Sequence, residues 1–393
     1  MSQLSWPALS FREQQWFHRD PMSSRRATRR NTGTFRAAVV PHIRDLTPSV
    51  SAELQAATVR MSDRLRDFDR ESRHLDSLPF AAILLRGESV SSSQIENITV
   101  RARKLSLATL GVSSAPNANL VARNVRAMQA ALAASDHLTT ESILAMHREL
   151  TEGIPGDSGM LRREWVWIAG ESPVTADHVG PHWDDLPDLM RDLVAFMDRR
   201  DIDPLVQAAI AHAQFEIIHP FTDGNGRTGR ALVSSLLRAR GVTQHVTVPL
   251  SSGLLHGKSR YVEALTDYRS GTLESIVSCF VSACESALAS TAILHADVAA
   301  FHREVLASRQ RVTRSLRAIA DLCCAEPAFT GRMVEDLAHV SKPTAYRTVQ
   351  ELVERGLLRE ENAKVSGSTV WTAPRILRAL DDFAERAGRR ASE

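Results

Sequence analysis

The residues best suited to chemistry stand in one stretch that combines a titratable base, a carboxylate, a glycine-rich turn and two arginines. It reads His219-Pro220-Phe221-Thr222-Asp223-Gly224-Asn225-Gly226-Arg227-Thr228-Gly229-Arg230. A histidine can accept a proton at neutral pH, and a carboxylate can hold a divalent cation. Glycines let main-chain N–H groups approach a phosphate, and guanidinium groups bind phosphates. This stretch therefore predicts a site that holds a nucleoside triphosphate and moves a proton beside it.

The segment from Gly224 to Gly229 also matches G-x-G-x-x-G, the fingerprint of dinucleotide-binding proteins. That fingerprint follows a β-strand, whereas the segment before this one has a helical pattern that ends at Ile218, so we reject this interpretation. The alternative is an anion cradle at a helix N-terminus, where N–H groups and the helix dipole attract phosphate. Arg227 and Arg230 are three residues apart and share a helix face, where they can clamp neighbouring phosphates.

Apolar residues at helical spacing dominate the rest of the chain, so a mainly α fold is expected. Thr139 and Asp203 are the expected N-caps of two helices. Residues 153–181 break the pattern, and Trp165–Ile168 is the best strand candidate, in a short hairpin around Gly170. Helices are expected over 51–70, 79–91, 120–134, 139–150, 183–199, 203–218, from within the glycine-rich motif to 239, 258–268 and 273–300.

Length and charge set limits on organisation. A chain of 393 residues exceeds the usual size of a single core, so two or three domains are expected. A formal net charge of +2 does not by itself indicate nucleic-acid binding. The first 44 residues, however, carry eight arginines against Glu13 and Asp20. This imbalance predicts a basic, poorly ordered arm over residues 1–35 that could contact nucleic acid or an acidic partner.

The cysteines predict a reducing compartment. Cys279, Cys284, Cys323 and Cys324 form no C-x-x-C pair, so we expect reduced core thiols in a cytoplasmic protein. The N-terminus lacks the charged and apolar regions of a signal peptide, and no apolar run approaches the length of a membrane span. No membrane association is therefore expected.

The stretch at 219–230 resembles the signature of the Fic-domain family, H-x-F-x-[DE]-G-N-G-R-x-x-R. The resemblance extends over roughly residues 40–300. It implies a Fic-type helical domain at 136–300, preceded by an N-terminal helical region at 36–135. It also implies transfer of AMP from ATP to a Ser, Thr or Tyr hydroxyl of a target protein, with release of pyrophosphate.

The resemblance also implies a role for each residue of the motif. His219 would be the general base, and Asp223 would bind Mg²⁺ between the α- and β-phosphates. Asn225, with the N–H groups of Gly224 and Gly226, would form an anion hole for the α-phosphate. Arg227 would bind the β-phosphate and Arg230 the γ-phosphate. Thr228 and Gly229 would belong to the nucleotide-binding segment, and Phe221 would anchor the loop in the core.

Two flanking segments resemble further parts of the family. Residues 165–181 resemble its β-hairpin flap, where residues 166–181 would bind the target protein as an added strand. Residues 253–265 resemble the helix that lines the adenine side, with Tyr261 at the usual tyrosine. A Tyr-Tyr pair is common there, whereas this chain has Tyr261-Val262.

A third segment, Ser92-Ser93-Gln94-Ile95-Glu96-Asn97, resembles the family's inhibitory motif [ST]-x-x-x-E-[GN]. Ser92, Glu96 and Asn97 match its defined positions. By this resemblance Glu96 pairs with Arg230 and so takes the place of the γ-phosphate, which leaves ATP in an unproductive pose. A carboxylate is a plausible competitor for a guanidinium that binds phosphate.

Residues 308–380 show three helical patterns followed by two candidate strands, which resembles a winged helix-turn-helix. In a DNA-binding interpretation, residues 341–355 form the recognition helix, with Lys342, Thr344, Tyr346 and Arg347 facing the major groove. From residue 311 onward, fourteen Lys and Arg stand against twelve Asp and Glu, which is a weak excess for a DNA-binding domain. Dimerisation, including a homodimer, or binding of another protein therefore stays open.

Three functions remain in competition. The first is a self-inhibited protein adenylyltransferase that uses ATP and Mg²⁺. The second is a winged-helix transcription regulator whose Fic domain senses nucleotide or modifies the regulator itself. The third is an enzyme with a different reaction, which either transfers another phosphate-bearing group or removes AMP. The intact His219, Asp223 and two arginines favour the first.

Overall fold

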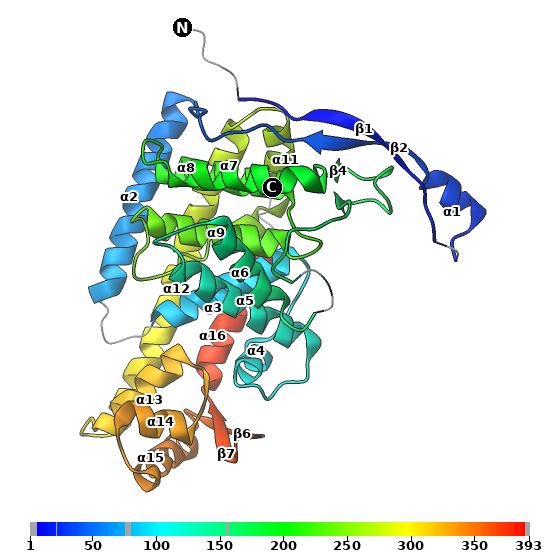
Figure 1. Ribbon diagram of the computed structural model, residues 1–393. Helices are drawn as coiled ribbons and strands as arrows, with labels where there is room; N and C mark the ends of the chain where they lie inside the picture. The colour runs from blue at the N-terminus through cyan, green and yellow to red at the C-terminus, as the bar shows by residue number, and fades with distance from the viewer. Residues whose placement is uncertain (1–5, 21, 75–79, 155, 157, 390–393) are drawn as a thin grey trace. The chain divides into compact units, whose positions relative to one another are not determined.

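Helices make up most of the chain, and three small antiparallel sheets interrupt them (Figure 1). The computed structural model describes residues 6–20, 22–74, 80–154, 156 and 158–389. The chain divides into two compact units. The first comprises residues 1–62, 127–240 and 259–281, and the second comprises residues 63–126, 241–258 and 282–393. The predicted mainly α fold is confirmed.

The first unit contains the predicted site. Three helices continue from one unit into the other: α2 (Ala52–His74), α5 (Pro116–Ala133) and α12 (Glu274–Ala307). The other elements of the first unit are β1 (Ser10–Trp16), α1 (Arg25–Arg30), β2 (Gly33–Val39), α6 (Thr140–Thr151), β3 (Trp167–Ile168), β4 (His178–Val179), the 3-10 helix η1 (Trp183–Asp185), α7 (Leu186–Asp198), α8 (Pro204–Ile218), α9 (Asn225–Ala239) and, after its first residue, α11 (Lys258–Arg269).

Helix α8 forms the centre of the first unit. Every residue from Leu205 to Ile218 is buried, as expected for a helix that is apolar on all sides. Asp203 caps it as predicted, because its carboxylate accepts from the N–H groups of Leu205 and Val206. At Gly229 of α9 an added Cβ would lie 2.9 Å from the ring of Phe215, so a glycine is needed where α8 and α9 pack together.

The N-terminal segment forms an ordered arm, so the prediction of a poorly ordered arm is wrong for its described residues. Strands β1 and β2 pair antiparallel from Ser10 opposite Val39 to Trp16 opposite Gly33. The short helix α1 lies at the outer end of this hairpin (Figure 1). Phe35 and Ala37 of β2 are buried in an apolar cluster with residues 165–179. The polar residues of β1 hid this long-range contact from sequence reasoning.

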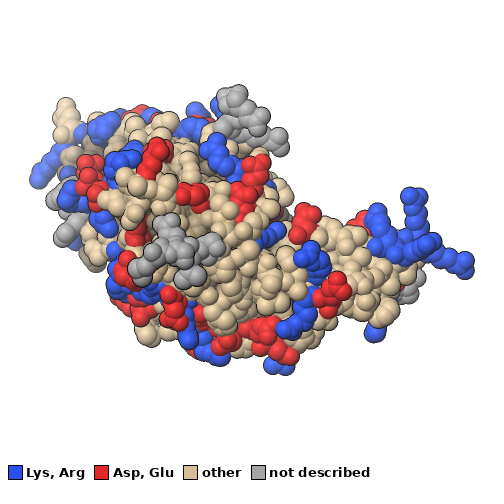
Figure 2. Space-filling model, turned by 90° about the horizontal axis from the view of Figure 1, so that it is seen from above, with Lys and Arg blue, Asp and Glu red and all other residues tan. Residues whose placement is uncertain are grey.

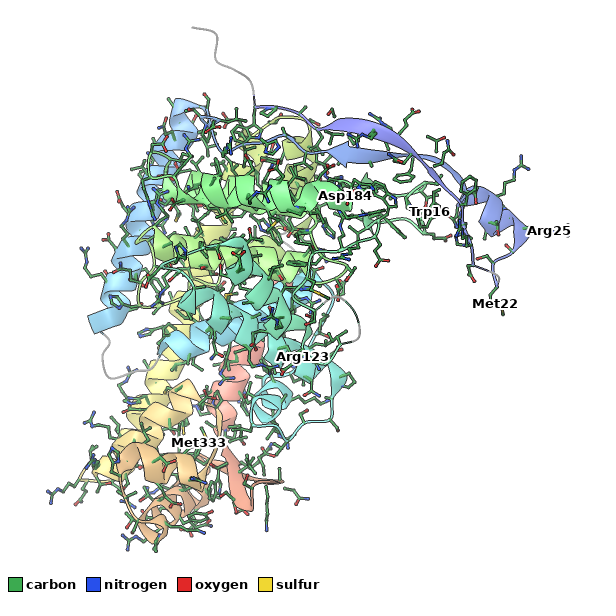
Figure 3. The ribbon with its side chains drawn as sticks, in the orientation of Figure 1. Trp16, Met22, Arg25, Arg123, Asp184 and Met333 are labelled. Atoms are coloured by element: carbon green, nitrogen blue, oxygen red, sulfur yellow. The ribbon has the colours of Figure 1, made fainter. Side chains whose placement is uncertain are left out.

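The outer end of the arm is strongly basic. The exposed arginines of α1 gather there, as Figure 2 shows, and Met22 and Arg25 mark the same end in Figure 3. Arg30 pairs with Glu171. The arginines that make the arm basic in sequence are thus exposed at the end of a folded hairpin.

The second unit contains the segment that resembles an inhibitory motif and all the C-terminal elements. Helix α3 begins at Phe80, and Pro79 lies outside the described residues. Apart from the helices shared with the first unit, the elements of the second unit are α3 (Phe80–Ile95), α4 (Ala102–Thr109), α10 (Leu250–His256), α13 (Arg314–Ala325), β5 (Ala328–Thr330), α14 (Gly331–Ala338), α15 (Lys342–Glu354), β6 (Arg359–Val365), β7 (Ser368–Thr372) and α16 (Pro374–Gly388).

The C-terminal elements follow the order expected of a winged helix-turn-helix. Helices α13, α14 and α15 precede the two strands β6 and β7, and β5 completes an antiparallel sheet in the order β5-β7-β6. Lys342 and Arg347 of α15 are exposed as predicted. Tyr346 is a correction, because its ring is partly buried and packs edge-on against Trp371 with centroids 5.0 Å apart.

Helix α3 shares one hydrophobic core with these C-terminal elements. Phe80, Ile83 and Leu84 lie in the same buried cluster as Leu316, Trp371 and other C-terminal residues. An added Cβ at Gly87 would lie 3.1 Å from the ring of Phe383 in α16. Arg86, which is 5% exposed, forms an ion pair with Glu326. The helix that contains Ser92 and ends just before Glu96 is therefore held by C-terminal side chains.

The cysteines are buried free thiols, as predicted. Burial raises the pKa of Cys279 to about 11, which keeps the thiol protonated and unreactive. One expectation about membranes needs correction: α12 contains an 18-residue window long and apolar enough to cross a membrane. Of that window 44% is buried, and the core helix of a soluble protein meets the same criterion.

Close packing of α10 yields a stability prediction within the second unit. An added Cβ at Gly253 would overlap the main chain of Ala283, whereas at Gly257 its nearest neighbour would lie 3.9 Å away. We expect Gly253→Ala to lower the free energy of unfolding by about 1–3 kcal/mol, because overpacking displaces the main chain. Chemical denaturation measures this change, with Gly257→Ala as the matched control. Equal stabilities of the two variants would contradict it.

Candidate active site

His219 lies at the C-terminal end of α8, where the chain leaves the helix. Its backbone is left-handed, with φ 49° and ψ 61°, which is unusual for a residue other than glycine and points to a functional constraint. Its Nδ1 lies 3.1 Å from the carbonyl oxygen of Glu216. A carbonyl can only accept, so Nδ1 carries the proton of the neutral ring. Nε2 therefore holds the basic lone pair.

Arg162 fixes the main chain of His219. Its side chain is 1% exposed, and it donates to the carbonyl oxygens of His219 (2.8 Å), Glu164 (2.8 Å) and Pro181 (2.7 Å). Burial lowers the pKa of the guanidinium to about 10, so it remains a cation at neutral pH. Arg162 thus joins residues 164–181 to the site. Its role cannot be read from the sequence, because no local pattern marks its burial.

Asn225 closes the loop that follows His219. Its side-chain oxygen accepts from the N–H of Phe221 at 2.9 Å, and its amide donates to the carbonyl of Phe221 at 2.8 Å. The residue is 2% exposed. Both polar atoms of the side chain thus hold the loop in shape, and the amide nitrogen keeps a second N–H, so the predicted part of Asn225 in an anion hole stays a prediction.

His147 supports the same loop and was not identified from the sequence. Its ring stacks parallel on Phe221 with centroids 3.7 Å apart, which confirms Phe221 as a core anchor. Gly159 donates its N–H to His147 Nδ1 at 3.0 Å, so Nε2 carries the proton. That Nε2 lies 3.0 Å from the carbonyl oxygen of Asp223 and donates to it. A fixed tautomer therefore holds the carboxylate-bearing turn.

Helix α9 begins within the motif, as predicted. Gly224 precedes it with φ 80°, and an added Cβ there would lie 2.8 Å from Leu150, so glycine is needed on both grounds. The N–H of Gly224 donates to Asp223 Oδ1 at 2.6 Å instead of pointing to a ligand. Gly224 gives α9 no side-chain cap, and the N–H groups of a helix's first turn, here including that of Gly226, are the kind of donors that bind an anion.

Charged groups of both signs stand at this helix start. The Asp223 carboxylate is 75% exposed and lies 3.3 Å from the Arg227 guanidinium, which is 5% exposed. Arg230 is buried one turn further along α9. Thr228 is fully buried and Gly229 packs against α8, so neither presents a side chain to a nucleotide. Any contact of these two positions with a nucleotide would therefore be made by the main chain.

Tyr261 lies in the interior of the first unit. It is 4% exposed, and its hydroxyl lies 2.7 Å from Nε2 of His212 in α8. The predicted single helix over 253–265 is interrupted at Gly257, where α10 ends and α11 follows. The structure therefore gives Tyr261 a packing contact with α8, in place of the expected contact with adenine.

The flap is a minimal hairpin. Trp167 pairs with Val179 and Ile168 with His178, which confirms the predicted strands around Gly170. His178 is buried, and its Nε2 lies 3.1 Å from the carbonyl oxygen of Ile217 at the end of α8. The flap is therefore attached to the helix that carries His219.

The segment over 92–97 is described within the second unit. Helix α3 ends at Ile95, and Asn97 takes a left-handed backbone with φ 61°, which asparagine and glycine adopt most readily. Lys258 donates from Nζ to the carbonyl oxygen of Ile95 at 2.5 Å. Ser92 is buried and Glu96 is exposed. The restriction of the motif to Gly or Asn at its last position thus has a backbone reason.

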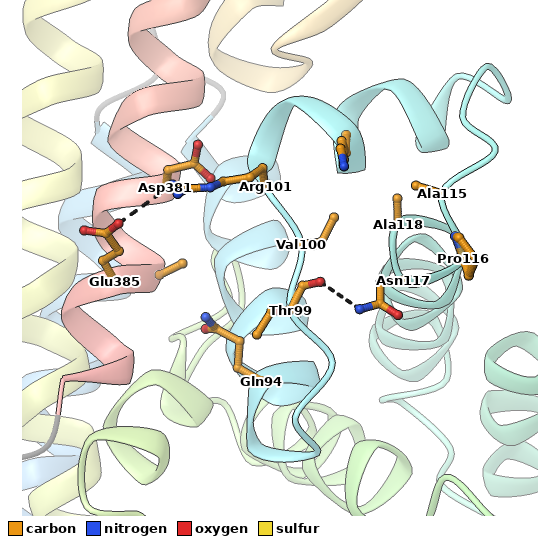
Figure 4. Close-up of a pocket in the computed structure, with 12 residues that line it drawn as sticks. Gln94, Thr99, Val100, Arg101, Ala115, Pro116, Asn117, Ala118, Asp381 and Glu385 are labelled. Carbon is orange, nitrogen blue, oxygen red and sulfur yellow. Dashed lines mark hydrogen bonds and ion pairs between the residues drawn. The ribbon is translucent and has the colours of Figure 1, made fainter.

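A hollow of about 580 Å³ borders this segment (Figure 4). Gln94 and Thr99 line it on either side of Glu96, and Asp381 and Glu385 line it from α16. Asp381 accepts from the N–H of Ala102 at 2.8 Å, which caps α4. The hollow contains none of the residues from 219 to 230, so it is separate from the predicted site.

Residues 137–237 match the Fic/DOC family, a range that contains the whole motif from His219 to Arg230. This part of the chain is therefore similar to a Fic domain. Protein adenylyltransferase fic-1 of Caenorhabditis elegans is 33% identical over 135 residues, which are 34% of this chain and 26% of that protein. Protein adenylyltransferase Fic of Aedes aegypti is 35% identical over 111 residues, which are 27% of this chain and 21% of that protein. The chain thus matches about a quarter of these relatives' length.

The likeness to a solved structure extends beyond residues 137–237. The match to the crystal structure of a Fic family protein from Desulfovibrio desulfuricans G20 covers 83% of this chain and 97% of that protein's chain, with a TM-score of 0.52. The two sequences are 20% identical, so the likeness concerns the fold.

Two buried histidines of the first unit yield a pH prediction. Burial lowers the pKa of His178 and of His212 to about 3, so both are neutral in the folded state. In the unfolded chain a histidine has a pKa of about 6.5. Below that value the unfolded state binds protons that the folded state does not. The free energy of unfolding should therefore fall as the pH drops from about 6.5, by up to ~1.4 kcal/mol per pH unit for each histidine.

Chemical denaturation at pH 7 and pH 5 measures this loss. His178→Gln keeps a donor toward Ile217 and removes the titrating group, so it should lose less stability between the two pH values than the wild type. His137→Gln, at an exposed histidine, is the control and should behave as the wild type. An unchanged pH dependence in His178→Gln would contradict the assignment.

Proposed function

We propose that the protein is an adenylyltransferase that transfers AMP from ATP to a hydroxyl group of a protein target. The main support is the geometry of His219, whose Nδ1 is engaged by the Glu216 carbonyl, so that Nε2 is the basic nitrogen. The names of the relatives described above point to the same activity. His219 also stands directly before the anion-binding start of α9.

In this reaction His219 Nε2 takes the proton of the target hydroxyl. The hydroxyl oxygen then forms a bond to the α-phosphorus of ATP, and the bond from that phosphorus to the oxygen bridging the β-phosphate breaks. Pyrophosphate leaves with the bonding electrons. The protein contributes position and charge, which is what phosphate-directed transfer requires.

The start of α9 would hold the triphosphate. The uncapped N–H groups of the first turn face the anion, and Arg227 and Arg230 add two cations on one helix face. Asp223 would hold Mg²⁺, and its largely exposed carboxylate suits that ion. Among the described residues no cluster of three His, Cys, Asp or Glu forms a protein-only metal site. One carboxylate plus phosphate oxygens and waters is the usual set for Mg²⁺, which would neutralise the phosphate charge.

We also propose that Glu96 restrains the enzyme by competing with the γ-phosphate for Arg230. The support is the match of Ser92, Glu96 and Asn97 to the inhibitory motif, together with the rigid base of the segment in the second unit. Glu96 follows a helix whose body is buried, and the left-handed Asn97 fixes the exit of the chain.

Self-modification tests the activity and the restraint together. Glu96→Gly should raise the incorporation of labelled AMP from ATP by about tenfold or more, equivalent to at least ~1.4 kcal/mol of lost inhibition. Glu96→Gln should have a smaller effect, because it keeps the shape and loses the charge. The double variant Glu96→Gly/His219→Ala is the blank.

Mass spectrometry identifies the adduct and separates the competing chemistries. An added AMP that is lost in the His219→Ala variant supports the proposed function. An adduct of different mass indicates transfer of another phosphate-bearing group. Labelling that is the same in the wild type and in Glu96→Gly would reject the inhibitory role.

A second candidate function is DNA binding by α15, favoured by its exposed Lys342 and Arg347. We expect an electrophoretic mobility shift with a duplex of mixed sequence that weakens steeply between about 50 and 200 mM salt, because phosphate contacts release counterions. Arg347→Glu should abolish the shift, and Arg389→Glu, outside α15, should not. No shift at low salt would leave a protein-binding or dimerisation role for residues 341–355.

A further inference from the structure

A hollow beside the catalytic loop is lined by four of the chain's six tryptophans. It lies in the first unit and has a volume of about 470 Å³. Thr222, three residues after His219, forms part of its wall, so the hollow borders the proposed site of transfer. Its lining consists of Trp16, Arg163, Glu164, Trp165, Val166, Trp167, Trp183 and Thr222.

The tryptophans come from three separate segments. Trp16 belongs to the N-terminal arm, as its position in Figure 3 shows, and packs edge-on against Trp167 of the flap with ring centroids 5.9 Å apart. Trp165 packs edge-on against Trp183, with centroids 5.4 Å apart. All four are half-buried. His182 packs against Trp183 with centroids 3.9 Å apart, whereas edge-on pairs cover only part of the other three rings, so their indole surface remains available to a ligand in the hollow.

Charge decides what such a hollow binds. The face of an indole is electron-rich and attracts a cation placed within about 6 Å of its centre. Glu164 adds a carboxylate to the lining, and the exposed Asp184 follows Trp183 directly. Arg163 is the single cationic residue in the lining. Glu164 and Arg163 balance each other, so the four indole rings decide, and their electron-rich faces favour a cationic occupant over an acidic or a purely apolar one.

We propose that this hollow binds a lysine or arginine side chain of the target protein, close in sequence to the hydroxyl that is modified. The inference rests on the proposed function, because it assumes a target that binds along the flap. Trp167 is itself a flap residue, so a chain lying there passes the hollow on its way to His219. The arm, through Trp16, thus takes part in substrate selection.

Peptide specificity tests this role. The Glu96→Gly variant is incubated with ATP, Mg²⁺ and a randomised library of peptides that contain Ser, Thr or Tyr. Modified peptides should be enriched in Lys or Arg near the modified hydroxyl. For a selected peptide, Trp16→Ala should raise KM about three- to thirtyfold and leave kcat nearly unchanged, as expected for a lost cation–π contact.

Matched variants separate this effect from damage to the arm. Phe17→Ala changes the next residue, whose side chain is 63% exposed, and should leave KM unchanged. Trp16→Phe keeps an aromatic face and should lie between the wild type and Trp16→Ala. Enrichment of apolar residues, or modification without any preference, would overturn the proposal.

Direct binding keeps the inference separable from the proposed function. The indole N–H resonances are followed by NMR during titration with a Gly-Lys-Gly-Thr-Gly peptide and with its norleucine counterpart. The lysine peptide should shift the indole resonances at lower concentration. Equal responses, or none, would overturn the cation site whether or not the chain shows transferase activity. If the protein does not modify itself but its indole resonances respond selectively to the lysine peptide, the proposed function is rejected and the cation site stands.

Discussion

The site depends on one buried cation. Arg162 donates to the carbonyl oxygens of His219, Glu164 and Pro181, and so joins the end of α8 to both ends of the flap segment. Burying a guanidinium is costly unless its donors are satisfied, which explains why three carbonyls converge on it. His219 and the surface proposed for the target thereby share one support.

The sequence allowed prediction of the helices, the flap, and the start of α9 at the glycine-rich motif. Those features follow from periodicity and capping, which are local. Tyr261 shows the limit of this reasoning, since its hydroxyl suits ligand binding but is hydrogen-bonded to His212 in the interior. Arg162 and His147 were missed for the opposite reason, because their partners are main-chain atoms far away in sequence.

The N-terminal arm is a second case in which contacts between distant segments could not be predicted from the sequence. Its composition suggests disorder, because the arginines and polar residues outnumber the apolar ones. Phe35 and Trp16 nevertheless order it by contacts with Trp165 and Trp167, which composition does not reveal. A few aromatic contacts between distant segments can outweigh the tendency of a polar segment to remain unfolded.

The core that α3 shares with the C-terminal elements has a consequence for how such chains can be recombined. Ile83 and Leu84 face the same apolar interior as Leu316 and Trp371, and Gly87 leaves room for Phe383. Helix α3 and the C-terminal elements therefore share one packed core, although about two hundred residues of sequence separate them. Exchange of either part for that of a relative would require complementary changes in the other, so the two should be exchanged as a pair.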